Sequence, residues 1–311
     1  MLGAVDIGGT KIAVGLVDDD GRLVAHQETP VCVEQGFSEA MGRVSAMLRS
    51  QIEQTSAKLM GIGIGCTGPI DPFTGRLEDV NTLPGWEGSD PVRMLSSNFD
   101  VSVAMENDAD AAALAEAHWG SGKGKARFAC ITVGTGIGSA LILDGALYRG
   151  ADHSHPEFGH HILDPGGPLC TCGAYGCWEA MASGPALEAR ARKLASAEIP
   201  REALSAMGVC EFARKGEPWA VEAVQREGRL LGMGLANIIT LFMPDLIALG
   251  GSVMKSADLL MTPIHEVIRT NCRLVPFEKC EVVRAHLGAE VGLLGAAQVW
   301  RHRFDFHEEG K

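Results

Sequence analysis

Short apolar runs separated by glycine turns open the chain. The stretch V-D-I-G-G-T-K-I-A-V-G-L-V, at 5–17, places two β-rich runs on either side of Gly8-Gly9-Thr10, and Asp20-Gly21 provides a second turn. This pattern predicts strand–turn–strand rather than strand–helix. A Walker A loop or a dinucleotide fingerprint needs a helix directly after its glycines, so neither fits this stretch.

The same layout recurs in the middle of the chain. The segment 131–145 again reads as a strand, a Gly/Thr turn, a strand and an Asp-Gly turn. For the first copy alone a plain hairpin is the alternative, because Gly-Gly turns are commonplace. Two copies favour a duplicated unit whose turns bind anions through backbone N–H groups and, in the first copy, the Thr10 hydroxyl.

Apolar spacing predicts the remaining elements. At 38–57 apolar residues recur at helical intervals, and 59–66 reads as a strand. Trp86, in a loop, is expected either to pack in the interior or to line the wall of a cleft. Further strands are predicted at 101–105, 246–252 and 282–285, and helices at 111–119, 183–197, 217–241 and 290–302. Small residues are expected on the crowded faces of the long helix at Gly228, Gly232 and Gly234.

Chain length and the lack of a linker bear on domain organisation. With 311 residues, 46% of them hydrophobic and 21% charged, the chain can bury two sizeable cores. No low-complexity stretch separates them, so the boundary is expected to be a hinge. We place a small α/β lobe at 1–107 plus 290–311, with the terminal helix packing back on it, and a large α/β lobe at 108–289. The tail at 307–311 is expected to fray.

Charge and hydropathy exclude several classes of protein. The formal net charge of −12 disfavours a nucleic-acid surface, because Lys and Arg neutralise phosphate in such binding. No stretch approaches the roughly 18 uninterrupted apolar residues of a membrane span, and the strand-like start lacks the features of a signal peptide. Most of the nine cysteines are dispersed, which fits reduced thiols. We expect a cytoplasmic protein that binds neither nucleic acid nor membrane. A homodimer or homotetramer is expected as well.

A compact motif at 160–177 has the composition of a metal site. Soft thiolates and an imidazole suit Zn²⁺, and four protein ligands make a closed, structural site. Gly173 and Gly176 are expected to take positive φ or to allow close backbone approach around the ion. Ordinary buried thiols or a disulfide are the alternatives. The candidate ligands are His160, Cys170, Cys172 and Cys177.

Acidic residues follow the strand predicted at 101–105. The sequence Glu106-Asn107-Asp108-Ala109-Asp110 precedes a strongly helix-forming stretch. Acidic residues also stabilise a helix start, which is the alternative interpretation. Three carboxylates and an amide exceed what a cap needs, and strand ends point side chains to where open α/β sheets bind ligands. Asp110 is predicted to be a cap or a solvated helix residue.

These motifs together resemble one family. The run G-H-x9-C-x-C-G-x2-G-C-x-E, from Gly159 to Glu179, is similar to the signature of the ROK family of sugar kinases and sugar-responsive repressors. D-I-G-G-T-K and G-T-G-I-G resemble its two phosphate loops, and the segment 67–71 its G-P-x-D turn. Ser139 stands where the second loop usually continues with glycine. The resemblance covers essentially the whole chain and implies a two-lobed actin/hexokinase-like (ribonuclease H-like) duplicated α/β fold with a central cleft.

The resemblance also implies an activity and a set of site residues. It indicates an ATP-dependent, glucokinase-like hexose kinase with Mg²⁺ and a structural Zn²⁺, in which Asp108 is the general base and Asp6 anchors hydrated Mg²⁺. If one nitrogen of His160 binds the metal, the other is held as an N–H donor for a sugar hydroxyl. The implied sugar-binding residues are Gly68, Asn107, Asp108, Glu157, His160 and Glu179. The implied ATP- and phosphate-binding residues are Asp6, Gly8, Gly9, Thr10, Lys11, Gly134, Thr135, Gly136, Gly250 and Gly251.

Other functions within the family stay open at this point. The same motifs suit a kinase of N-acetylmannosamine or another N-acetylhexosamine, and a fructokinase. A sugar-responsive repressor is disfavoured, because a winged helix-turn-helix would need several tens of residues before the turn that follows Asp6. A non-catalytic sugar-binding protein is disfavoured because both phosphate loops and Asp108 are present.

Overall fold

The chain forms two compact α/β units. The computed structural model describes residues 1–305. Unit 1 comprises Met1–Lys123 and His286–Lys311, and unit 2 comprises Gly124–Ala285. The C-terminal segment thus returns to unit 1, as expected, whereas the tail at 307–311 lies outside the described residues. No helix within 1–305 is both long and apolar enough to cross a bilayer.

Each unit is built on a five-stranded sheet. Unit 1 contains β1 (Leu2–Ile7), β2 (Lys11–Val17), β3 (Leu23–Pro30), β4 (Gly61–Cys66) and β7 (Ser102–Asn107), besides the small sheet of β5 (Ile70–Asp71) and β6 (Arg76–Leu77). Unit 2 contains β8 (Arg127–Val133), β9 (Ile137–Leu143), β10 (Ala146–Leu147), β11 (Leu246–Gly250) and β12 (Glu281–Arg284).

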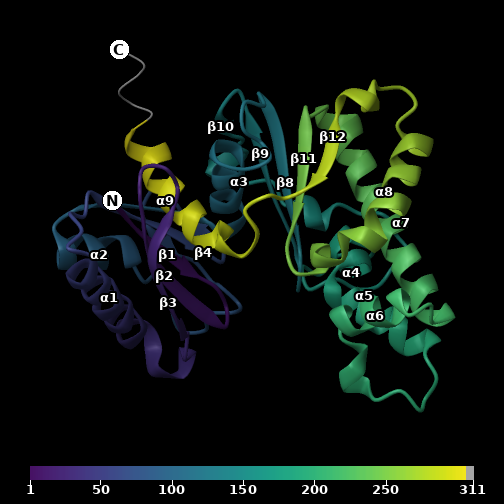
Figure 1. The fold of residues 1–311 in the computed structure, drawn as a ribbon, viewed down its shortest axis with the longest axis horizontal. Coiled ribbons are helices and arrows are strands. Elements are labelled where there is room, and N and C mark those ends of the chain that lie inside the picture. Colours follow the sequence, from purple (N-terminus) through teal and green to yellow (C-terminus); the bar gives the residue numbers. More distant parts are fainter. Residues whose placement is uncertain (306–311) are drawn as a thin grey trace. The chain divides into compact units, whose positions relative to one another are not determined.

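The two sheets share one topology. The strand orders are β3-β2-β1-β4-β7 and β10-β9-β8-β11-β12 (Figure 1). In unit 1, β1 pairs antiparallel with β2 and parallel with β4, and β4 pairs parallel with β7. In unit 2, β8 pairs antiparallel with β9 and parallel with β11, and β11 pairs parallel with β12. The glycine turns that repeat in the sequence therefore occupy equivalent positions, between β1 and β2 and between β8 and β9. This equivalence confirms the duplicated unit.

Helices complete both units. Unit 1 has α1 (Gly36–Thr55), α2 (Pro91–Phe99), α3 (Asp108–His118) and α9 (Val291–Phe304), and unit 2 has α4 (Trp178–Ala182), α5 (Gly184–Leu194), α6 (Ala206–Arg214), α7 (Pro218–Phe242) and α8 (Ala257–Asn271). Short 3-10 turns are η1 (Val33–Gln35), η2 (Ala151–His153), η3 (Phe158–His160), η4 (Arg201–Leu204), η5 (Val253–Ser256), η6 (Phe277–Lys279) and η7 (Gly288–Glu290). The sequence patterns did not predict α2, α4, α6 and α8.

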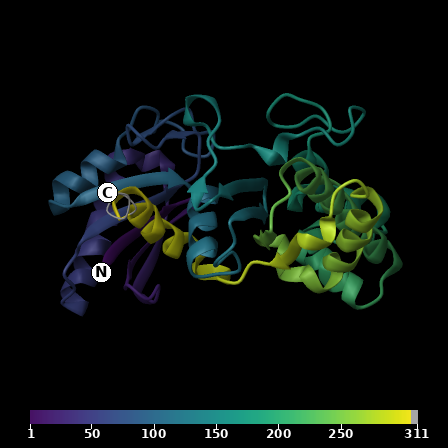
Figure 2. The same ribbon diagram turned by 90° about the horizontal axis from the view of Figure 1, so that it is seen from above.

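Strand alternation builds two cores around the sheet of unit 1. Val5 and Ile7 of β1 face a core shared with α1, whereas Leu2 and Ala4 face a core shared with α9. α9, yellow in Figures 1 and 2, lies against the sheet of its own unit in both views. Gly63 of β4 permits this approach, because any side chain there would collide with the backbone of α9.

The predicted lobe boundary at residue 107 differs from the observed division after Lys123. The reason is α3, which packs along α9 so closely that a side chain at Gly295 would collide with the backbone of Ala111. α3 therefore belongs to unit 1. Asp110, predicted to be a cap or a solvated helix residue, is fully buried in the first turn of α3, so it is not solvated.

Unit 2 packs its long helices around a buried tryptophan. The Trp178 indole is inaccessible to solvent and its N–H donates to the Leu230 carbonyl on α7, at 3.1 Å. Gly234 of the same helix makes room for this ring, since a side chain there would overlap it. Gly228 and Gly232 similarly allow α8 to approach α7, as predicted for the crowded faces of this helix.

Candidate active site

The first glycine turn is a tight connection between β1 and β2. The Gly8 N–H donates to the Lys11 carbonyl at 3.0 Å, which closes the turn. Gly9 lies against Thr82 so closely that an added Cβ would sit 2.7 Å from the threonine Cβ. Thr10 and Lys11 are exposed, and the Lys11 ammonium pairs with Glu28 at 2.6 Å. The turn thus presents the hydroxyl of Thr10 and the cation of Lys11 at the surface.

Two carboxylates lie together at the carboxyl ends of β1 and β7, the two parallel strands that flank β4 in unit 1. Asp6 is near the end of β1, and Asp108 follows β7 and begins α3. Burial and the negative charge of Asp108 raise the pKa of Asp6 to about 6. Gly292 on α9 leaves the space that the Asp6 carboxylate fills, and Asp108 itself is exposed. One carboxylate is therefore partly buried and the other is exposed.

Asn107 and Gly68 adjoin Asp108. The Asn107 side chain caps α3 by accepting from the Ala109 N–H at 2.9 Å, and Asp108 Oδ1 accepts from the same donor at 2.8 Å. A side chain at Gly68 would reach within 2.9 Å of Asn107 Nδ2, so the backbone there runs close to the amide. The structure therefore gathers the unit 1 residues predicted for the sugar, and the capping alternative also holds for Asn107.

The second glycine turn joins β8 to β9 and contacts Glu179. The Gly134 N–H donates to the Gly136 carbonyl at 2.9 Å. Beyond the turn, the Ile137 N–H donates to Glu179 Oε2 at 2.9 Å, and any side chain at Gly136 would collide with that oxygen. Thr135 at the tip is exposed. A predicted sugar ligand thus lies directly beside a predicted phosphate turn.

The glycines after β11 lie next to this second turn. Gly251 adopts a left-handed φ of 89°, and an added Cβ there would clash with the Val133 backbone. A Cβ at Gly134 would lie 3.5 Å from Ser252 Oγ. Gly250, at the end of β11, pairs with Thr132 of β8. The residues predicted for the nucleoside and for the second phosphate turn therefore form one surface of unit 2.

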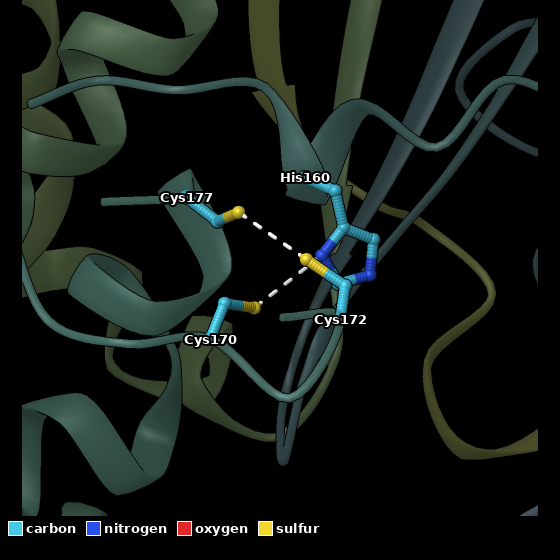
Figure 3. A group of neighbouring side chains, drawn as sticks. All are labelled: His160, Cys170, Cys172 and Cys177. Atoms are coloured by element: carbon cyan, nitrogen blue, oxygen red, sulfur yellow. Dashed lines mark hydrogen bonds between the residues drawn. The ribbon is translucent and has the colours of Figure 1, made fainter. Parts of the chain in front are cut away.

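The candidate metal ligands converge on one point (Figure 3). Their ligand atoms all lie within 4.8 Å of one another. Cys170 Sγ is 3.5 Å from His160 Nδ1, and Cys172 Sγ is 3.6 Å from Cys177 Sγ. Tetrahedral zinc with Zn–S bonds of about 2.3 Å separates its ligands by about 3.7 Å, so the set fits. A disulfide needs about 2.05 Å, so none joins these cysteines.

The loop around this cluster folds as its glycines predict. Gly173 has a φ of 89° and Gly176 a φ of 70°. A side chain at Gly176 would also collide with the Asp164 carbonyl. The Cys170 N–H donates to the Ala174 carbonyl at 2.8 Å, which closes the turn between the first two thiols. Glu179 lies only two residues after Cys177, so the fold of the cysteine loop fixes the position of its backbone.

Glu157 precedes His160 and is held by a histidine that the sequence interpretation did not single out. Its carboxylate lies 3.3 Å from His155 Nε2. The hydrogen bond and charge of His155 hold the pKa of Glu157 below its usual value, against the opposing effect of burial. His160 turns Nδ1 toward the cysteines, which leaves Nε2 as the nitrogen available to a ligand.

Ser139 is a second residue whose role the sequence did not predict. It is buried on β9 and its hydroxyl bonds to the backbone on both sides of Glu157. A signal existed, because strand alternation places it on the same face as the apolar Ile137 and Leu141. A serine on a buried apolar face indicates a specific hydrogen-bonding task.

Comparison with known proteins assigns the family. The family model described as "ROK family" matches residues 2–303. The chain belongs to the ROK family. A glucokinase of Streptomyces coelicolor is 34% identical over 315 aligned residues, with 96% of each chain covered. An N-acetylmannosamine kinase of Haemophilus influenzae is 31% identical, with 94% of this chain and 93% of the relative covered.

A solved relative supports the fold. The crystal structure of a ROK family glucokinase from Streptomyces griseus, in complex with glucose and AMPPNP, matches with a TM-score of 0.82 and 32% identity. The match covers 96% of this chain and 98% of that one. The duplicated actin/hexokinase-like α/β fold implied by the sequence motifs is thereby confirmed.

Proposed function

We propose that this ATP-dependent sugar kinase of the ROK family transfers the γ-phosphoryl group of ATP to the 6-hydroxyl of glucose. The observation that carries the proposal is the pair of carboxylates in unit 1, with Asp108 exposed beside the partly buried Asp6. The similarity to glucokinases over nearly the whole chain supports glucose as the acceptor.

Phosphoryl transfer needs alignment, charge neutralisation and a base on the attacking hydroxyl. Asp108 supplies the base in this proposal, because its exposed carboxylate at the start of α3 can reach a bound hydroxyl. Asn107 and the Gly68 backbone hold the same sugar from the side. The proton of the hydroxyl passes to Asp108 as the oxygen attacks phosphorus.

Asp6 is the proposed anchor for hydrated Mg²⁺. Burial and the charge of Asp108 raise the pKa of Asp6 to about 6, and a nearby cation would offset both the loss of solvation and the repulsion between the two carboxylates. Mg²⁺ usually binds one or two carboxylates together with substrate phosphates, and it neutralises charge that develops on them. In the absence of the cation, protonation of Asp6 as the pH falls through about 6 would compete with Mg²⁺ for this carboxylate.

The glycine turns are proposed to bind the nucleotide. Backbone N–H groups at the two turns and the Thr10 hydroxyl suit phosphate oxygens. Lys11 adds a cation that Glu28 holds in place. Thr135 and the surface at Gly250 and Gly251 complete the proposed nucleotide contacts in unit 2.

The cluster of three thiols and one imidazole is proposed to hold a structural zinc ion. All four positions are protein ligands, so the site lacks an open position for catalysis. With Nδ1 of His160 turned to the cysteines, Nε2 carries the proton and donates to a sugar hydroxyl. Glu157 and Glu179 flank this donor in sequence, and the three groups together are proposed to read the hydroxyl pattern of the sugar.

The proposed specificity rests on hydrogen bonds between these three side chains and the hydroxyl groups of the sugar. Polar groups that a sugar desolvates are costly to leave unpaired, so an analogue lacking a matched hydroxyl should lose up to about 10⁴–10⁵ in kcat/KM. This favours a pyranose with several equatorial hydroxyls, and glucose fits. N-acetylmannosamine is the second candidate, because a kinase of that sugar is 31% identical to this chain.

A coupled ADP-release assay tests the proposal. Glucose, mannose, fructose, N-acetylglucosamine and N-acetylmannosamine are each supplied with MgATP and ranked by kcat/KM. Glucose should rank first. A clear preference for an N-acetylated sugar would replace glucose while leaving the kinase mechanism intact. Absence of ADP release with every sugar would contradict the activity itself.

A further inference from the structure

Ser139 carries a buried hydroxyl that the proposed mechanism does not use. It lies on β9, three residues after Gly136 of the second glycine turn, and is 1% exposed. Ile137 and Leu141, on the same face of the strand, are buried apolar residues. A hydroxyl in such surroundings costs free energy unless it is hydrogen-bonded, so its partners indicate its task.

Both partners of this hydroxyl flank Glu157. Ser139 Oγ donates to the Pro156 carbonyl at 2.8 Å and accepts from the Phe158 N–H at 3.0 Å. Phe158 is itself buried and stacks on Phe242, with ring centroids 5.2 Å apart. The backbone on either side of Glu157 is therefore fastened to β9 from the inside, while the residue itself is exposed.

The beginning of β9 holds the second carboxylate as well. The Ile137 N–H donates to Glu179 Oε2 at 2.9 Å. Because residues two apart on a strand are separated by about 6.6 Å, Ile137 and Ser139 form a short template. At one end of this template the Ile137 N–H binds the Glu179 carboxylate. At the other end Ser139 binds the backbone on both sides of Glu157. Both residues follow the second glycine turn.

We propose that Ser139 is a positioning residue for sugar discrimination, which sets where the Glu157 carboxylate meets a sugar hydroxyl. The inference rests on the proposed role of Glu157 in reading the sugar. Without the hydroxyl, the 156–158 segment loses two bonds to β9 and Glu157 shifts relative to Glu179. A displacement of about 1 Å in such a group can cost about 10²-fold in rate.

The test compares Ser139→Ala with Ser139→Thr. The alanine variant removes both hydrogen bonds and should lower kcat/KM for glucose by about 10- to 100-fold, mainly through KM. Discrimination against deoxy analogues of glucose should narrow, while KM for MgATP stays within about twofold of the wild-type value. Threonine keeps the hydroxyl and suits a strand, so it should recover most of the loss.

Ser45→Ala is the matched control. Ser45 is also a buried serine, 3% exposed, whose hydroxyl donates to a backbone carbonyl, that of Met41 on α1 in unit 1. It should leave KM for glucose unchanged. If Ser45→Ala raised KM as much as Ser139→Ala, or if Ser139→Ala kept KM and discrimination within about twofold, the positioning role would be refuted.

Amide exchange provides a readout that needs no turnover. In Ser139→Ala the Phe158 amide loses its acceptor, so exchange in peptides covering 157–163 should accelerate at least about tenfold while the α7 peptides stay protected. Unchanged exchange there would refute the inference. If wild-type protein phosphorylated no sugar, the proposed function would fall, whereas this exchange and calorimetric glucose binding would still decide the role of Ser139.

Discussion

At the scale of single residues, environment separates carboxylates that look alike in the sequence. Asp6, Asp108 and Asp110 belong to one unit and lie near one another along β1 and α3. Asp6 is partly buried with a raised pKa, Asp108 is exposed, and Asp110 is fully buried. Only Asp108 combines exposure with a position at a strand end. That combination identifies it as the proposed base.

Asp108→Asn should abolish the base while preserving sugar binding. A positioned base contributes about 10²–10⁴-fold, so kcat with saturating glucose and MgATP should fall by that factor. Glucose affinity measured by calorimetry should change little. Asp90→Asn is the matched control, because Asp90 caps α2 by accepting from the Arg93 N–H at 2.7 Å and has no proposed catalytic role. A variant of Asp108 that retained more than about a third of wild-type kcat would falsify its assignment.

At the scale of elements, α5 and α7 are joined by a part-buried hydrogen bond between Arg190 and Glu227. Arg190 donates to Glu227 Oε2 at 2.8 Å and to the Met181 carbonyl at 2.7 Å. Glu227 is fully buried, and this burial raises its pKa to about 7 despite the lowering effect of Arg190. The pair therefore links α5, α7 and the end of α4 by hydrogen bonds, and its contribution to the free energy of unfolding depends on pH.

The sign of that dependence follows from proton linkage. The folded protein holds a proton on Glu227 up to about pH 7, whereas the unfolded chain releases it near 4.5, so its contribution to stability is full below pH 4.5 and is lost as pH rises to 7. The span amounts to about 3 kcal/mol. Glu227→Gln should remove this slope from the free energy of unfolding measured by urea denaturation between pH 4.5 and 7. Glu222→Gln, on the exposed side of α7, should keep it; equal slopes in wild type and Glu227→Gln would contradict the prediction.

The cysteine loop is the second element with a testable role. Cys172→Ser should lose zinc, thermal stability and glucose affinity together, because Glu157, His160 and Glu179 are arranged around this loop. Elemental analysis, a thermal melt and calorimetry follow the three losses. Cys32→Ser, a thiol remote from the cluster in sequence and absent from it in the structure, should change none of them. Metal-free wild-type protein with normal stability and activity would exclude a structural zinc.

At the scale of the whole molecule, the chain passes twice between its units. The crossings lie after Lys123 and after Ala285. Near each crossing, a residue of unit 1 binds the buried carboxylate of Glu116. Glu116 accepts from the Ser121 N–H and hydroxyl and from the Leu287 N–H, each at 2.8 Å. Bending is therefore expected within the few residues at each crossing rather than inside α3.

Closure on the substrate is the prediction at this scale. The proposed mechanism has Asp108 in unit 1 and Glu157, His160 and Glu179 in unit 2 act on the same sugar. Glucose should then draw the units together and exclude water that would compete as acceptor. The radius of gyration from small-angle X-ray scattering should decrease at saturating glucose and stay constant with a sugar that is not phosphorylated. An unchanged radius with glucose would count against closure.

The sequence by itself determined the features that depend on local spacing. Two glycine turns between apolar runs predict two strand–turn–strand units, because strand period and turn chemistry act over a few residues. The metal ligands are equally local, since Cys170, Cys172 and Cys177 share one turn with glycines that need positive φ. Family motifs then located the candidate site residues of both units.

Only the tertiary structure decided the features that depend on residues far apart in the chain. α3 joins unit 1 because α9 returns from the end of the chain and packs along it, and Asp110 in the first turn of α3 is fully buried. Which nitrogen of His160 faces the cysteines is set by how η3 meets the loop at 170–177. In the sequence, Ser139 is only a departure from the glycine of the family motif. Its hydrogen bonds to the backbone on both sides of Glu157 form only when folding brings β9 and the 156–158 segment together.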